Sequence, residues 1–199
     1  MPPLTTLSDQ EKKLLVDEQE TRLARRLALR VIEKPEPPFW VGFLPMGIVF
    51  FAQKLKRYST DLEDFARNFL ASRKLVLEAV MTSRKSANIV DLGKVLERAG
   101  DMPPPSRPLF VDWAVHLAGH YEALLSAYGP THSALVRAAY ADKAGYLRFC
   151  GTLNELESSY NMSLVPAVDG DAQDILHAVR KMNHELSALH RLDAEDIFP

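Results

Sequence analysis

Apolar residues recur at spacings of three and four along almost the whole chain, and this spacing limits the fold more than any other feature. No stretch shows the sustained alternation of apolar and polar residues that a half-buried strand requires. One side of the segment 110–128 carries a row of large apolar residues at helical spacing: Phe110, Trp113, Leu117, Tyr121, Leu124 and Tyr128. The sequence therefore predicts an all-α fold, a bundle of six or seven helices.

Capping residues and prolines indicate where these helices begin and end. Ser8 and Glu11 have the spacing of a capping box, and the prolines from Pro35 onward stop the helix that this box starts. Thr60 and Glu63 repeat the spacing, which predicts that a new helix begins there. The expected helices are 8–33, 46–58, 60–84, 88–98, 110–128, 131–160 and 171–190, followed by a loosely docked tail at 192–199.

A proline-rich break, DMPPPSRP at 101–108, coincides with a change in the sign of the charge. Residues 1–100 carry 17 Lys and Arg against 13 Asp and Glu, a net of +4, whereas residues 101–199 carry 7 against 13, a net of −6. We therefore expect a basic N-terminal helical part and an acidic C-terminal part of three helices. The two parts are interpreted as one globular unit whose charges complement each other.

Composition excludes several classes of protein. Apolar residues make up 47% and charged residues 25% of the 199 positions, which is typical of a globular protein that folds without metal or disulfide staples. Cys150 is the only cysteine, so an intrachain disulfide and a four-cysteine zinc site are impossible. The chain is not basic enough for a nucleic-acid binder, and its start lacks the pattern of a secretory signal. We therefore expect a cytoplasmic protein.

The stretch 37–53, PPFWVGFLPMGIVFFAQ, is the most unusual segment, because its 17 residues include four phenylalanines, a tryptophan and no charge. It could be buried core, a shallow membrane or partner contact, or a transmembrane span. At about 1.5 Å per residue it is shorter than the roughly 30 Å of a bilayer core, and Pro45 interrupts it, which argues against a span. The predicted contact residues are Phe39, Trp40, Phe43, Leu44, Phe50, Phe51, Lys54, Lys56 and Arg57.

A second, weaker pattern consists of histidines and carboxylates on three helices. Asp112, His116 and His120 are spaced by four residues and share one side of a helix. Together with Glu155 and His184 they could converge on a zinc or iron ion, which imidazole and carboxylate groups bind. The sequence lacks HExxH and the repeated Glu-x-x-His of di-iron bundles, and solvated or partly packed histidines with local ion pairs, the favoured interpretation, explain the pattern without a metal.

Two hypotheses about function follow. The first is a non-enzymatic accessory or adaptor protein without a cofactor, which docks through 37–58 on a protein partner, on a second copy of itself or on a membrane surface. The alternative is a metal-binding helical bundle that could act as a metal-dependent hydrolase, with His116, His120, Glu155 and His184 as the ligands.

Overall fold

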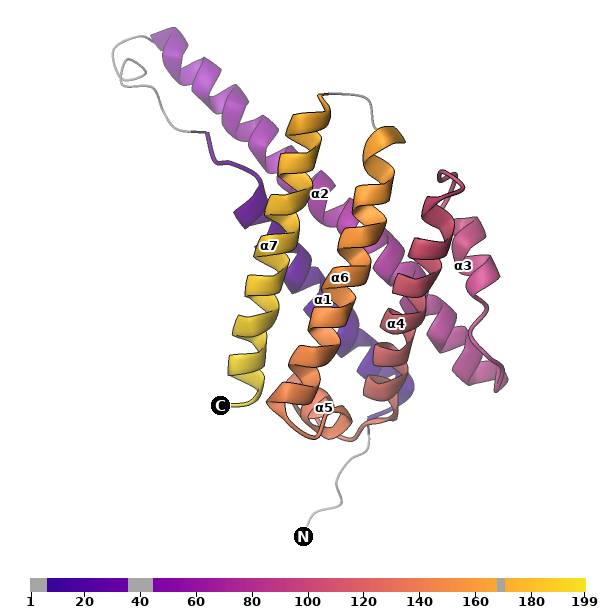
Figure 1. Ribbon diagram of the computed structural model, residues 1–199. Coiled ribbons are helices and arrows are strands. Elements are labelled where there is room, and N and C mark those ends of the chain that lie inside the picture. The colour runs from indigo at the N-terminus through magenta and orange to yellow at the C-terminus, as the bar shows by residue number, and fades with distance from the viewer. Residues whose placement is uncertain (1–6, 36–44, 168–170) are drawn as a thin grey trace.

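The computed structural model describes residues 7–35, 45–167 and 171–199, and for residues 45–54 it describes only the course of the helix. Within these ranges all the regular structure is helical, as the sequence predicts (Figure 1). Seven α-helices and one 3-10 turn are described: α1 (Asp9–Val31), α2 (Pro45–Ser86), α3 (Leu92–Arg98), α4 (Ser106–Ser126), α5 (His132–Ala139), α6 (Lys143–Leu164), the 3-10 turn η2 (Val165–Ala167) and α7 (Ala172–Ile197).

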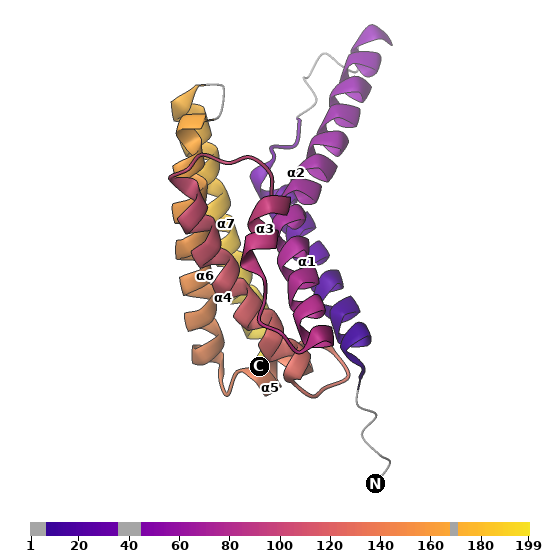
Figure 2. The ribbon, with the colours of Figure 1, turned by 90° about the vertical axis from the view of Figure 1, so that its right-hand side faces the viewer.

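The helices form two layers. α4, α6 and α7 lie in one layer, and α1 and α2 lie side by side in the other, as the second view shows (Figure 2). α3 packs on α2 and α4, and α5 contacts α1, α4 and α7 at one end of the bundle. The layers face each other through the contacts of α1 with α7 and of α2 with α4.

Both halves of the chain contribute to one buried apolar core. Val76 and Val80 of α2 belong to the same buried cluster as Leu117 of α4 and Leu153 of α6. A smaller cluster joins Leu23 and Leu27 of α1 to α7. The proline-rich break therefore connects two halves that share one buried cluster, and α4 begins within the break, at Ser106.

The start of α1 confirms the predicted capping box, but α2 corrects the prediction for Thr60. The backbone N–H of Ser8 donates to Glu11 Oε2 at 2.7 Å, and Ser8 Oγ accepts from the Glu11 N–H at 3.3 Å. Thr60, by contrast, lies inside one continuous helix, and its hydroxyl donates to the carbonyl of Lys56 at 3.2 Å. This bond to the preceding turn is typical of a mid-helix threonine, so two predicted helices are one.

Other helix ends also differ from the prediction, including the start of α4 at Ser106 and the end of α6 at Leu164. The expected helix 131–160 is divided into α5 and α6, because Asp142 accepts from the Gly145 N–H at 2.6 Å and caps a new helix. α3 begins at Leu92, where Asp91 is the N-cap, and not near Asn88. The predicted loose tail is wrong, since α7 continues to Ile197, which is buried.

Candidate functional site

The N-terminal part of α2 extends beyond the end of α1. Salt bridges join Lys13 to Glu78 and Asp17 to Lys74, so the two helices are antiparallel and Val31, where α1 ends, is level with about residue 60. Residues 45–58 of α2, which we call the arm, therefore pass the end of α1 by roughly 20 Å at 1.5 Å per residue. The arm points away from the other helices in both views (Figures 1 and 2).

The arm contains part of the predicted contact surface. Leu55, Lys56 and Arg57 are exposed on it. Phe50, Phe51 and Lys54 lie on the helical course of the arm, but their side chains are outside the described residues. The remaining predicted contact residues, Phe39, Trp40, Phe43 and Leu44, are in the segment 36–44, which is also outside the description.

The two histidines of α4 pack on a single aromatic ring. His116 and His120 both stack on Phe149 of α6, with ring centroids 4.8 and 4.4 Å from it. His116 Nε2 lies 3.1 Å from the carbonyl oxygen of Phe149, and His120 Nδ1 lies 2.7 Å from the Tyr140 hydroxyl. These contacts occupy one ring nitrogen of each histidine, so the sequence pattern on α4 reflects packing between helices.

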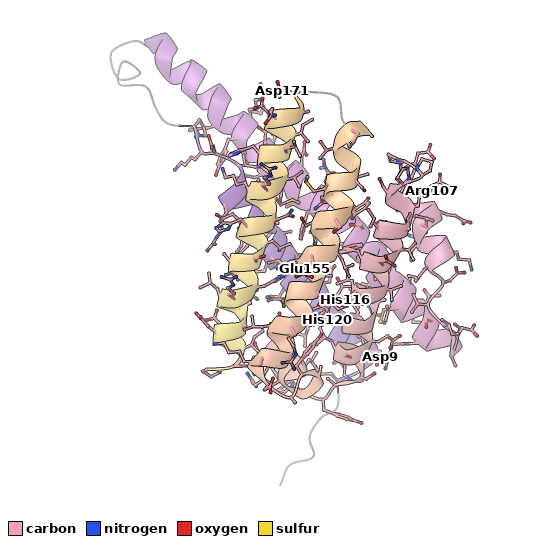
Figure 3. The ribbon with its side chains drawn as sticks, in the orientation of Figure 1. Asp9, Arg107, His116, His120, Glu155 and Asp171 are labelled. Carbon is pink, nitrogen blue, oxygen red and sulfur yellow. The ribbon has the colours of Figure 1, made fainter. Side chains whose placement is uncertain are left out.

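The other two predicted metal ligands do not join them. Glu155 on α6 and His184 on α7 are exposed, whereas His116 is half-buried and His120 is buried; Figure 3 labels Glu155 and these two histidines. In the parts of the chain that the structure describes, no three His, Cys, Asp or Glu side chains come together in a way that could hold a metal ion. The structure thus brings together two of the four candidates, around an aromatic ring.

A small polar cavity lies deeper in the bundle and was not anticipated from the sequence. It measures about 30 Å³, and it is lined by Glu20, Arg73, His120, His132, Cys150, His190 and Asp193, among others. A cavity of this size accommodates one or two water molecules. His190 Nδ1 is buried and has no hydrogen-bond partner among the described residues.

Burial is the main cause of the shifted pKa values of the side chains in this interior. It lowers the pKa of His190 to about 3, with Arg73 adding to the effect, and it holds the pKa of His120 well below 6.5. It also raises the pKa of the Cys150 thiol to about 12, so this cysteine is not a thiolate nucleophile near neutral pH. His120, His190 and Cys150 are therefore suited to packing as neutral side chains.

Arg73 is the charged centre of the interior. Its guanidinium donates to Glu157 at 2.6 Å and to Glu20 at 3.3 Å, and Glu20 also accepts from the Tyr121 hydroxyl at 2.7 Å. Burial disfavours the charge on Arg73, but the two carboxylates outweigh this effect and raise the pKa of the guanidinium. This network joins α1, α2, α4 and α6, and its members are too far apart in sequence for any local pattern to reveal them.

A groove of about 600 Å³ lies on the surface between α1 and α2. It follows Thr21 to Leu29 on α1 and Ser59 to Lys74 on α2, and it therefore begins where the arm ends. Most of the lining is apolar, including Ala28, Leu29 and Leu62. Leu29 is 61% exposed, a high value for a leucine beside other apolar side chains.

Comparison with protein-family models, with curated proteins and with solved structures finds no match to this chain. Among the helices of the described residues, none is both long and apolar enough to cross a membrane.

Proposed function

We propose that this chain is a non-enzymatic accessory or adaptor protein that docks through the arm and the apolar stretch before it. The observation that carries the proposal is the length of α2, which extends an apolar and then basic segment beyond the bundle. A helix that continues past its packing partner presents residues that the protein's own core does not need. The targets are a membrane surface or a protein, the latter including a second copy of the chain.

Charge and aromatic content support both kinds of target. Lys54 directly follows the uncharged stretch 37–53, and the exposed Lys56 and Arg57 come within the next three residues, so basic and apolar groups adjoin. At an anionic bilayer each such basic residue contributes about 1 kcal/mol, and tryptophan and phenylalanine are suited to the interfacial region. At a protein interface the same aromatic residues are common anchors.

Vesicle flotation tests the membrane target. The wild-type chain is expected to float with vesicles of phosphatidylcholine and phosphatidylserine and not with phosphatidylcholine alone. K56E/R57E should weaken this binding by at least about 30-fold, because it removes two basic contacts of about 1 kcal/mol each and adds two acidic side chains that the anionic surface repels. The matched control is K85E/R107E, which makes the same charge change at exposed positions outside the arm and should bind as the wild type does.

Protein targets are tested by sedimentation velocity and by photo-crosslinking in the native cells. Self-association through the apolar stretch 37–53 should be lost in F43D/V49D. In the crosslinking experiment, a crosslinker at Leu55 should capture a defined partner that a crosslinker at the exposed Val115 does not capture. If the chain neither floats nor self-associates, and if the two crosslinking positions give the same products, the proposed function is wrong.

A further inference from the structure

The groove between α1 and α2 lies on the side of α1 that faces away from α7. Leu23 and Leu27 pack against α7. At 100° per residue, Thr21 is 200° around the helix from Leu23, and Arg25 is 200° from Leu27. Ala28, Ala66 and Ala71 are among the lining residues, and their small side chains make room between the two helices. The result is a surface along which an additional helix could pack.

The charged residues of the groove are mainly basic. Arg25, Arg67 and Lys74 line it together with a single acidic residue, Glu63. The antiparallel pairing of α1 and α2 places Arg25 and Arg67 at about the same level on opposite walls. An occupant lying between them therefore has a guanidinium on each side.

Two of these cations have ion-pair partners that an occupant could replace. Arg67 pairs with Asp64 and Lys74 pairs with Asp17, and the side chains of all four are at least 37% exposed. Exposed pairs of this kind contribute at most about 1 kcal/mol, so exchanging the aspartate for another carboxylate costs little.

We propose that the groove binds an amphipathic helix of a partner protein, with acidic residues on both sides of its apolar stripe. The lined part of α2 spans 59–74, or about 22 Å, which matches a helix of roughly four turns. Recognition of an apolar helix face in a groove is a common binding mode, and the basic walls select for acidic flanks. This surface excludes the arm, so the inference goes beyond the proposed function.

The positions of the cations favour a helix over other occupants. Arg67 and Lys74 are seven residues apart, about 10 Å along the helix, which matches acidic residues at i and i+7 of a partner helix better than one lipid headgroup. A second copy's arm is a poor match, because its Lys54, Lys56 and Arg57 would meet like charges.

Fluorescence anisotropy with two synthetic peptides tests the proposal. Both peptides are helical, about 18 residues long, with leucine at i, i+3, i+4 and i+7. One has glutamate on both flanks, and the other has lysine at the same positions. The full-length chain is expected to bind the glutamate peptide and to bind the lysine peptide at least tenfold more weakly.

Two variants locate the binding in the groove. R25E/R67E should weaken binding of the glutamate peptide at least tenfold and strengthen binding of the lysine peptide. A66F, which fills the groove without changing charge, should weaken the binding of both. K85E/R107E, with the same charge change elsewhere, should bind the glutamate peptide as the wild type does, and thermal unfolding checks that each variant is folded.

Several results would overturn the proposal. One is equal affinity for the two peptides, and another is an R25E/R67E variant that behaves like K85E/R107E. A third is that R25E/R67E abolishes self-association, which would identify a second copy of the chain as the occupant. A fourth is that this variant no longer binds phosphatidylserine vesicles, which would identify lipid as the occupant. Because K56E/R57E leaves the groove intact, failure of the arm and failure of the groove are separate results.

Discussion

At the scale of single residues, the largest departure from expectation is the burial of Arg73. It is 2% exposed, and its position between lysine and serine on a helix with many charges is typical of a solvated residue. Its contacts come from Glu20, which is 53 residues away, and from Glu157, which is 84 residues away. Helical periodicity cannot indicate such partners, because it describes only neighbours on the same helix.

Replacing Arg73 should be costly because it leaves two carboxylates facing each other without their counter-ion. We expect R73M to lower the free energy of unfolding by about 3–5 kcal/mol, the usual cost of breaking a buried ion pair from one side. The measurement is urea unfolding of the wild type and the variant at pH 7.

The matched control is R67M on the same helix, whose exposed pair with Asp64 should contribute less than about 1 kcal/mol. The triple variant R73M/E20Q/E157Q should recover part of the loss, since it removes the uncompensated charges. Equal effects of R73M and R67M would contradict the importance of the buried network.

At the scale of elements, α2 shows why a capping pattern does not by itself define a helix end. Thr60 and Glu63 have the same spacing as Ser8 and Glu11, yet only the latter pair forms a cap. α2 continues because the turn before Thr60 is itself helical, so the Thr60 hydroxyl finds an acceptor in that turn. The continuity of α2 is also what produces the arm.

A pair of threonine substitutions tests this interpretation. Thr131 is the N-cap of α5 and accepts from the Ala134 N–H at 3.2 Å, so T131A should lower the free energy of unfolding by about 1 kcal/mol. T60A should change it by less than about 0.5 kcal/mol, because alanine is a good helix former in the middle of a helix.

Chemical denaturation of both variants provides the comparison. If T60A is as destabilising as T131A, then Thr60 caps a helix in solution, and α2 consists of two helices as the capping pattern predicts.

At the scale of the whole molecule, the buried histidines make stability depend on pH. His120 and His190 are neutral in the folded chain, whereas in the unfolded chain they take up protons below about pH 6.5. Their lowered pKa values mean that stability is complete above pH 6.5 and is lost as the pH falls toward the folded pKa. The fold contains this sensitivity because His120 on α4, His132 on α5 and His190 on α7 line the same interior cavity, and burial lowers the pKa of all three.

The free energy of unfolding should therefore be nearly constant between pH 7 and 8 and should fall between pH 6 and 4. Burial also lowers the pKa of His132, to about 4, so the slope should approach about 1.4 kcal/mol per pH unit for each of His120, His132 and His190. H190Q should reduce the slope by the contribution of one proton, about 1.4 kcal/mol per pH unit. The control is H177Q, at an exposed position of the same helix. A profile as flat at pH 5 as at pH 7 would contradict the burial of these rings.

The all-α class and the capping box of α1 could be predicted from the sequence alone, because helical periodicity and capping hydrogen bonds join residues within a few positions of each other. The apolar stretch before and within α2 was also visible there as a candidate docking segment. Only the tertiary structure decided that α2 is continuous past Thr60, that His116 and His120 pack on Phe149, and that Arg73 lies between Glu20 and Glu157. The groove belongs to the same group, since its walls are on two helices and their pairing decides which side chains share one surface.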